Sequence, residues 1–406
     1  MGDFDRGELS RRSFLTRVGQ AAFAMGLVRS APPIFGRPLS PDGFLYPVGQ
    51  AGAASGQTSK LIIRSENPQD FETPIELLNT WITPNDLFYV RSHLYTAKVD
   101  IKEWRLQVDG AVQQQLTLTL DDLKRFPESS QVVTLECSGN GRAFYDPPVA
   151  GAQWEKGAVG NARWVGVRLA DVLKKAGIKA EGKFLTTDGA DKPIGKVPDF
   201  IRSIPLDKAM HADTLLAYQM NGEPIPVSHG YPLRLIVPGW SGNNSVKWVT
   251  HLTLSDSPSD GFFQKTAYKF PERYVAPAGS IDPSLMKSIT NLSVKSSITN
   301  PLPGSQLKPG AVAVTGIAYA GEADIVAVDV STDLGQTWKP AELGRDRARY
   351  AWRLWQYQWE AKEPGSFLIM SRAKDSSGRV QPMVQNWNPS GYLWNVVDKV
   401  RVNVTA

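Results

Sequence analysis

The pattern of apolar and polar positions predicts short strands in the first two thirds of the chain. Runs or alternation of apolar residues indicate strands at Val132–Glu136, Leu233–Val237 and Val246–Leu254. These segments lack the regular strand–helix alternation of a doubly wound parallel sheet. The pattern therefore predicts an α+β domain.

One segment in this region has helical periodicity. Residues 167–176 place four apolar side chains on one helical face: Leu169, Val172, Leu173 and Ala176. Gly177 follows and can adopt the left-handed conformation that commonly ends a helix. We expect the helix to end there and to pack against the strands through this apolar face.

The pattern changes after about residue 285. Strands are predicted at Ala311–Ala318 and Asp324–Thr332, and a turn at Asp333–Gly335. Short strands separated by turn signals are typical of a β-sandwich. The sequence thus divides into a leader and linker (residues 1–57), an α+β domain (58–285) and a β-sandwich (286–406).

The N-terminal segment has the features of a signal peptide. Arg11 and Arg12 precede an uncharged stretch, residues 18–28, that is too short to span a bilayer. Paired arginines before such a stretch predict the twin-arginine route, which exports folded proteins to the periplasm. The alternative is the basic, partly apolar N-terminus of a cytosolic protein. No later segment is long and apolar enough to predict a membrane span.

Charge and cysteine content narrow the function classes. The formal net charge is +5, and no Lys/Arg run is interleaved with aromatic residues, so nucleic-acid binding is not indicated. An acidic protein partner or a small anionic substrate fits this balance. The chain has one cysteine and therefore no internal disulfide. By itself, that cysteine is either a small buried residue or a reactive or metal-bound thiolate.

The surroundings of this cysteine favour a chemical role. Val133, Leu135 and Cys137 alternate on one face of a predicted strand that runs into the glycine-rich turn 138–141. Arg142 follows, and a nearby cation favours the thiolate form. A zinc site is not indicated, since no second Cys or close His pair is present. A Cys–His protease using His229 stays open, although no known local signature surrounds the cysteine.

Residues 134–142 resemble the molybdenum-ligand segment of the sulfite oxidase family. Further segments resemble the family's other blocks in the same order: residues 86–93, 157–164, 216–222, 229–234 and 246–248. Residues 351–355 and 385–388 resemble its dimerisation domain. The resemblance therefore covers nearly the whole chain after the linker. It implies a sulfite oxidase-type molybdopterin-binding domain followed by an immunoglobulin-like β-sandwich, and it implies a homodimer.

The resemblance also implies a cofactor, molybdenum with a pyranopterin, in which Cys137 is the one protein ligand of the metal. Residues expected to contact the cofactor are Tyr89, Val90, Arg91, Ser92, His93, Asp191, His229, Arg234, Ser245, Val246 and Lys247. Of these, His93, His229, Arg234 and Lys247 match the positions that receive the pterin phosphate. One thiolate is sufficient because the pterin itself supplies two sulfur ligands.

For the substrate pocket, the resemblance implies an anion site made by Arg91, Arg142 and Arg353. Tyr218 is expected beside the metal, and Trp154 is expected as a pocket wall. Arginine suits a small oxyanion because its forked donors match the geometry of such a group. Arg353 stands between tryptophans, however, and an arginine in that context is otherwise a cation–π residue.

The implied activity is oxidation of sulfite to sulfate, with electrons passing to an external c-type cytochrome. The chain has no Cys-x-x-Cys-His segment, so no haem is expected within it. Two related alternatives stay open: a molybdenum reductase of protein methionine sulfoxide and a sulfane-sulfur dehydrogenase subunit. A catalytically silent binding module is the alternative from a different class.

Overall fold

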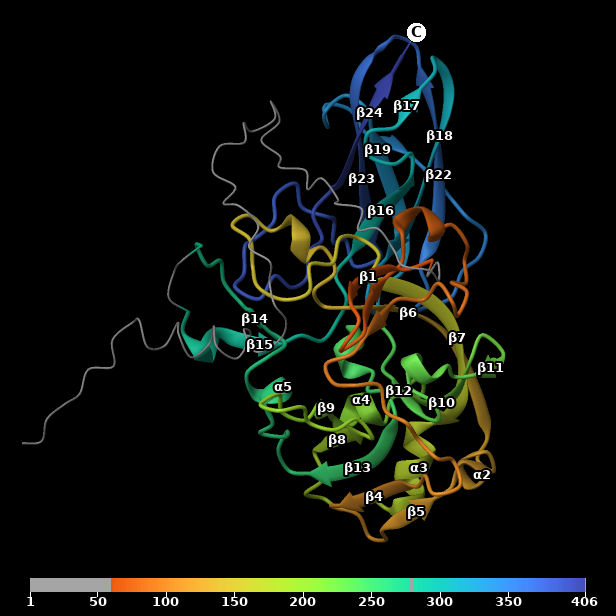
Figure 1. Ribbon diagram of the computed structural model, residues 1–406, viewed down its shortest axis with the longest axis vertical. Coiled ribbons are helices and arrows are strands. Elements are labelled where there is room, and N and C mark those ends of the chain that lie inside the picture. The colour runs from red at the N-terminus through yellow and green to blue at the C-terminus, as the bar shows by residue number, and fades with distance from the viewer. Residues whose placement is uncertain (1–59, 278–280, 406) are drawn as a thin grey trace, which may run out of the picture. The chain divides into compact units, whose positions relative to one another are not determined.

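A computed structural model describes residues 60–277 and 281–405. The predicted twin-arginine segment and linker lie outside the described residues. The described chain forms an α+β part followed by two facing sheets, as the sequence predicts (Figure 1). No helix in these residues has the length and apolar character needed to cross a membrane.

Three sheets build the first domain (Figure 1). The first contains β1 (Ile62–Ser65), β2 (Asp70–Glu72) and β3 (Val90–Arg91). The second has the order β11 (Glu223–Pro224), β10 (Leu215–Met220), β7 (Val159–Arg168) and β6 (Glu128–Glu136), with β12 (Arg234–Ile236) also paired to β10. The third has the order β5 (Leu116–Leu118), β4 (Leu106–Gly110), β13 (Val249–Ser255), β8 (Phe184–Gly189) and β9 (Arg202–Pro205).

Helices in the described residues are short. They are α2 (Leu120–Leu123), α3 (Leu169–Ala176), α4 (Leu206–Ala209) and α5 (Phe262–Lys265). Single 3₁₀ turns are η1 (Ile75–Leu77), η2 (Arg142–Phe144), η3 (Val227–His229), η4 (Gly242–Asn244) and η5 (Pro283–Leu285). Three of these turns, η2, η3 and η4, carry or adjoin predicted site residues.

The predicted helix is confirmed as α3, although it begins two residues later than expected. Its predicted apolar face is buried and belongs to the main core cluster of the first domain. Val167 instead belongs to β7, where it pairs with Glu128 of β6. Gly177 closes the helix with φ 70°, and its N–H donates to the carbonyls of Leu173 and Lys174. A positive φ is the reason that glycine suits this position.

Strand predictions were correct in position and less accurate in length. The predicted strand Val132–Glu136 is the buried half of the longer β6. The predicted strand Val246–Leu254 was wrong at its beginning, since β13 starts at Val249. Trp248 has φ 51°, which takes the chain out of extended conformation just before the strand. This kink lies directly beside Lys247, one of the predicted cofactor contacts.

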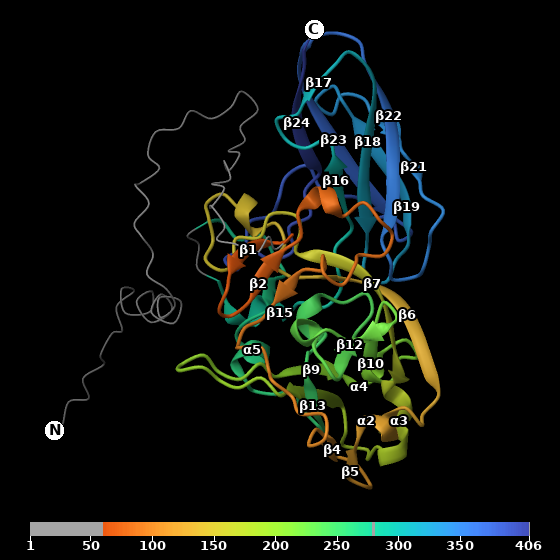
Figure 2. The ribbon, with the colours of Figure 1, turned by 45° about the vertical axis from the view of Figure 1, so that its right-hand side comes forward.

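The second domain consists of two facing sheets (Figure 2). One has the order β16 (Lys295–Asn300), β18 (Gly310–Tyr319), β22 (Arg353–Ala361) and β21 (Glu342–Leu343). The other has the order β17 (Gln306–Leu307), β24 (Asp398–Val404), β23 (Gly365–Asp375), β19 (Ile325–Ser331) and β20 (Lys339–Pro340). A hairpin of β14 (Lys269–Pro271) and β15 (Met286–Ser288) precedes them. Apolar residues of both sheets, including Trp355 and Trp359, form one core cluster between them.

Contacts join the two domains closely. Val133 of β6 forms a bridge with Tyr350, and the Thr134 N–H donates to the Tyr350 carbonyl at 2.9 Å. Trp352 packs with Val159 of β7 in a shared apolar cluster. The strand that leads to Cys137 is therefore supported from the second domain. The predicted boundary at residue 285 stays a prediction.

Candidate active site

Cys137 lies where β6 ends. The buried half of this strand pairs with β7 up to Glu136, and the Cys137 N–H then donates to the Ala158 carbonyl at 2.9 Å. The chain turns at once, because the Asn140 N–H donates back to the Cys137 carbonyl at 2.9 Å. Gly141 has φ 95°, a conformation that favours glycine. This geometry fixes the thiol at the junction of a rigid strand and a tight turn.

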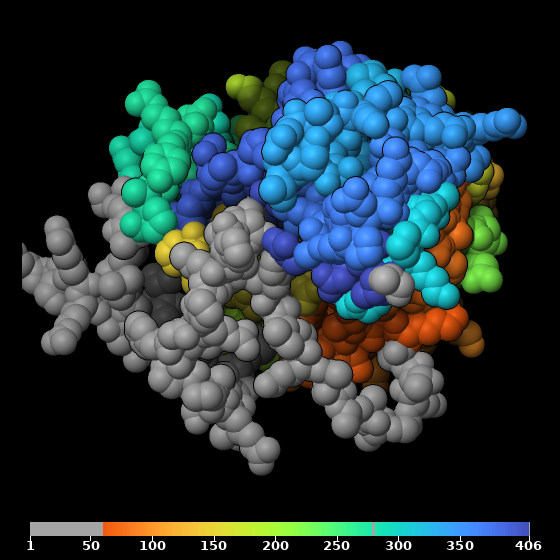
Figure 3. Space-filling model, turned by 90° about the horizontal axis from the view of Figure 1, so that it is seen from above, coloured from red at the N-terminus to blue at the C-terminus, as the bar shows by residue number. Residues whose placement is uncertain are grey.

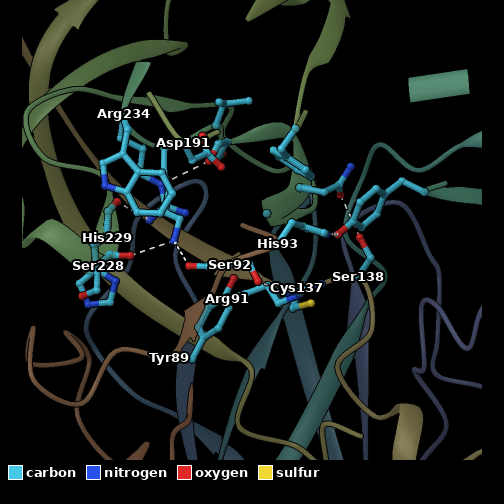
Figure 4. A pocket seen from close by; sticks show the side chains of 18 residues that line it. Tyr89, Arg91, Ser92, His93, Cys137, Ser138, Asp191, Ser228, His229 and Arg234 are labelled. Carbon is cyan, nitrogen blue, oxygen red and sulfur yellow. Dashed lines mark hydrogen bonds between the residues drawn. The ribbon is translucent and has the colours of Figure 1, made fainter. Parts of the chain in front are cut away.

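The thiol faces a pocket that opens to solvent. Eleven of the predicted site residues line it: Cys137, Tyr89, Arg91, Ser92, His93, Asp191, His229, Arg234, Ser245, Val246 and Lys247. Figure 4 shows Cys137 on one side of the pocket and Asp191, His229 and Arg234 on the other. The pocket therefore has a thiol end and a cationic end.

Strand β3 presents the first of these segments. It pairs with β2, so that Asp70 lies opposite Arg91 and forms an ion pair with it at 3.0 Å. The Arg91 guanidinium also donates to the Ser92 carbonyl. Val90 is buried on the strand and does not line the pocket. Arg91 is thus held in one orientation at the pocket wall.

The cationic end is built by three segments that meet. Arg234 donates to the carbonyls of His229 at 3.0 Å and Ser245 at 3.3 Å. The Lys247 ammonium donates to the Ser92 hydroxyl at 2.8 Å and the Ser228 carbonyl at 2.9 Å. Within the described parts of the chain, neither cation forms an ion pair with a carboxylate. Two buried cations thus lie together without a direct ion pair among the described residues.

The pKa values at this end reflect burial and the closeness of the cations to one another. Burial, together with Arg234, holds the pKa of Lys247 well below its usual value. Burial lowers the pKa of Arg234 to about 10, and burial with Arg234 and Lys247 lowers that of His229 to about 3. Asp191 lies near Lys247, but burial raises its pKa to about 6. A bound anion would relieve the unfavourable burial of these cations.

Arg142 does not line the pocket, but its charge acts on the Cys137 thiol. Its guanidinium donates to the carbonyls of Ala152 at 2.9 Å and Ser390 at 3.1 Å. Gly139 and Gly151 make room for it, since a Cβ at either position would lie within 2.7 Å of a guanidinium nitrogen. Burial raises the pKa of the Cys137 thiol, while Arg91 and Arg142 act to lower it. These arginines are the charges available to stabilise a thiolate or an oxyanion.

Two tyrosines that the sequence did not single out complete this end. Tyr268 lines the pocket, and its hydroxyl shares a 2.5 Å hydrogen bond with the Nε2 atom of His93. Tyr392 stacks on Tyr268, and its ring lies under the Arg142 guanidinium at 5.2 Å. Figure 3 shows C-terminal residues (blue) beside the segment around residue 270 (green).

His93 is held by aromatic rings. It stacks on Phe200 with ring centroids 4.3 Å apart, and Phe263 meets it edge to face. Burial and the nearby Arg91 hold its pKa well below the usual value. Its contact with Tyr268 places it near the thiol end, whereas the predicted contact with the pterin phosphate would place it at the cationic end. A neutral ring can orient the tyrosine hydroxyl by hydrogen bonding.

Tyr218 does not lie in the pocket, which corrects the predicted role beside the metal. Its side chain packs in the main core of the first domain, and its hydroxyl donates to Glu128 at 3.2 Å. Glu128 begins β6 and Cys137 follows the end of that strand. The separation along the strand is roughly 30 Å at about 3.3 Å per residue. Tyr268 is the tyrosine that faces the pocket.

Arg353 is also absent from the pocket, contrary to the prediction. It begins β22 and donates to the Gly344 carbonyl at 2.6 Å. The charges that act on it are those of Arg347 and Asp324, not those of the Cys137 region. Its neighbour Trp352 takes the buried position on the opposite side of the chain. Trp352 belongs to the cluster shared by the two domains, and Trp355 belongs to the core of the second domain.

Trp154 contributes to the wall behind the thiol. It is fully buried in the apolar cluster that contains Cys137, and its indole N–H has no hydrogen-bond partner among the described residues. The side-chain amide nitrogen of Asn243, a pocket-lining residue, is likewise without a partner there. Unpartnered buried donors are uncommon in proteins. These donors, the Cys137 sulfur and the cationic end of the pocket fit a cofactor in which a metal bound by sulfur is attached to an organic group that ends in a phosphate.

Comparisons with known proteins agree with this site. Residues 93–263 match the family model of an oxidoreductase molybdopterin-binding domain, and residues 286–405 match that of a Mo-co oxidoreductase dimerisation domain. The chain is 38% identical over 361 residues to mitochondrial sulfite oxidase of Rattus norvegicus. It is 38% identical over 349 residues to sulfite oxidase of Gallus gallus. These alignments cover 85% and 82% of this chain, and 66% and 76% of the two relatives.

A solved structure shares the same arrangement. The crystal structure of the sulfane dehydrogenase SoxCD from Paracoccus pantotrophus matches with a TM-score of 0.74 at 29% identity. The match covers 92% of this chain and 96% of that chain. Both domains of the present chain are those of a molybdopterin oxidoreductase. The chain belongs to the sulfite oxidase family.

Proposed function

We propose that this protein oxidises sulfite to sulfate at a molybdenum pyranopterin bound through Cys137. The observation that carries the proposal is one pocket in which the buried thiol and Arg91 lie at one end and buried cations without a direct ion pair lie at the other. The first end suits a redox metal and a small dianion, and the second suits a phosphate.

The cofactor would be held along the whole pocket. Cys137 would ligate the metal, and Arg234, Lys247 and His229 would receive the phosphate. When bound, the molybdenum centre supplies two-electron redox chemistry, by which sulfite and water give sulfate, two protons and two electrons. The neutral Asp191 expected below a pH of about 6 can donate a hydrogen bond to the pterin, whereas the carboxylate can only accept one.

The substrate would be held by this chain's own cations. Arg91 lies at the pocket wall and Arg142 lies behind the thiol end, and sulfite would bind where the charges of both stabilise its oxygens. Tyr268 would donate its hydroxyl hydrogen to the oxyanion, with His93 orienting it. Trp154 and the stacked ring of Tyr392 would restrict water around the site.

We extend the proposal to the protein's setting. A c-type cytochrome would accept the electrons one at a time, and the paired arginines at positions 11 and 12 support export of the folded protein to the periplasm. The match of residues 286–405 to a dimerisation domain supports a homodimer through the second domain.

The decisive experiment compares electron donors and acceptors on the purified, molybdenum-loaded protein. Sulfite with ferricyanide or cytochrome c should be turned over, while methionine sulfoxide with a reduced dye should not. The structural match to a sulfane dehydrogenase makes persulfide-bound sulfane sulfur the second candidate substrate. Turnover of a small-molecule persulfide without turnover of sulfite would replace the proposed activity.

A further inference from the structure

Glu136, the residue before Cys137, carries a buried carboxylate. Its Oε1 atom accepts three hydrogen bonds: from Lys295 Nζ at 2.8 Å, Tyr319 Oη at 2.7 Å and Asn140 Nδ2 at 2.9 Å. The acid, the lysine and the tyrosine are all buried. A buried carboxylate needs such partners, because burial without them disfavours its charged form.

The same carboxylate is connected to the turn that carries the thiol. Asn140 donates its side-chain N–H to Glu136 and accepts from the Ala158 N–H at 3.1 Å through its Oδ1 atom. The Asn140 backbone N–H donates to the Cys137 carbonyl. The orientation of the asparagine therefore depends on the carboxylate, and the turn at Cys137 depends on the asparagine.

Two of the three donors belong to the second domain. Lys295 begins β16 and Tyr319 ends β18, and these residues are direct partners in the antiparallel register of the two strands. Both side chains therefore start from one rigid point of the sheet. A second contact lies beside it, where the Leu393 N–H donates to the Ser138 carbonyl at 2.9 Å. The second domain thus holds the metal-ligand turn on two sides.

We propose that Lys295 and Tyr319 are positioning residues for the Cys137 thiol, so that the second domain is part of the construction of the cofactor site. They act through Glu136 and Asn140 and touch neither the pocket nor its contents. That the positioned thiol binds a metal rests on the proposed function, whereas the effect of Lys295 and Tyr319 on the position of the thiol does not.

The molecule offers a matched control for this proposal. Lys208 of the first domain forms an ion pair at 2.5 Å with Glu322 of the second domain and also donates to the Pro238 carbonyl. It is a buried lysine that connects the same two domains, although its acid partner is more exposed than Glu136. None of its partners belongs to the Cys137 turn.

Because the chain has one cysteine, the thiol can be followed directly. The full chain, produced without molybdopterin, is treated with iodoacetamide, and the rate of Cys137 alkylation is measured by mass spectrometry. Lys295→Met should raise this rate about tenfold or more, since the loosened turn exposes a thiol that is now buried. Lys295→Arg keeps a cation beside Glu136, so its rate should be close to that of the original chain. The rate of Lys208→Met should lie within about twofold of that of the original chain.

The controls separate positioning from general stability. Circular dichroism and thermal melting are recorded for each variant, and Tyr319→Phe serves if Lys295→Met does not fold. The phenylalanine removes one donor and keeps the ring, and it should raise the alkylation rate about threefold. Unchanged rates in folded Lys295→Met or Tyr319→Phe would overturn the proposal, as would an equal rise in Lys208→Met. Sulfite turnover is not used, so failure of the proposed activity leaves this result intact.

Discussion

The ring of Tyr392 stacks on the ring of Tyr268, with centroids 5.5 Å apart and planes inclined by 11°. Tyr268 lies between α5 and β14 in the first domain, and Tyr392 lies in the loop between β23 and β24 of the second domain. Arg142 lies over Tyr392, so the tyrosine pair connects the thiol end of the pocket to both domains.

Tyr268→Phe should lower kcat for sulfite by about 10- to 100-fold, because the variant loses a hydroxyl donor to the oxyanion while it keeps the ring stack. Steady-state kinetics on molybdenum-loaded protein would measure this effect. Tyr218→Phe is the control, since Tyr218 bonds to Glu128 far from the thiol, and its kcat should change by no more than about twofold. A larger loss in Tyr218→Phe would restore that residue to the site.

Arg142 and Arg353 should differ in their effects on sulfite binding. Arg142→Gln removes a cation that acts on the Cys137 thiol, so KM should rise about tenfold or more. Arg353→Gln leaves the pocket intact and should change KM by less than about twofold. Kinetics at fixed ionic strength would test both variants. A large rise in KM for Arg353→Gln would contradict the placement of this arginine outside the pocket.

The contiguous segments of the site were predictable, because their order along the chain is preserved in the resemblance. Residues 89–93, 229–234 and 245–247 do line one pocket with Cys137, apart from buried Val90 and the members of 229–234 that face elsewhere. Here short local turns determine which side chains face inward. Local sequence therefore carried the information that these segments needed.

The errors arose where tertiary packing decides the outcome. Arg353 stands in a recognisable block, but strand alternation directs it away from Trp352 and out of the site. Tyr268 has φ 54° after α5, and Tyr392 comes from a loop of another domain, so neither position follows from local pattern. The aromatic cluster of Phe262, Phe263 and Tyr268 was the signal that could have pointed to the missing tyrosine.

Cys137→Ser should fold and should lose sulfite turnover together with most of its molybdenum. A serine oxygen is a harder ligand than a thiolate and fits this metal centre less well. The molybdenum-to-protein ratio, measured by elemental analysis after gel filtration, should fall at least about tenfold. Melting of the cofactor-free protein is the control and should be nearly unchanged, since the substitution is small. Full metal content in a folded variant would remove Cys137 from the ligand role.

The cofactor-free protein should lose stability through His229 as the pH falls below about 6.5. Burial lowers the pKa of this histidine from 6.5 to about 3 in the folded chain. Between these values the unfolded chain binds the extra proton, so the free energy of unfolding decreases with falling pH. One such group contributes at most about 1.4 kcal/mol per pH unit. The contribution is fully present above the unfolded pKa.

Urea denaturation of the cofactor-free protein at pH 7.0 and 5.5 would measure this loss, and His229→Asn is the matched variant. Asparagine keeps a polar side chain of similar reach but does not titrate, so the loss between the two pH values should be smaller by up to about 1.3 kcal/mol. His251→Asn is the control, because His251 lies partly exposed beside Asp109 and not in the pocket. An equal pH dependence in the original chain and in His229→Asn would show that this histidine is not buried in neutral form.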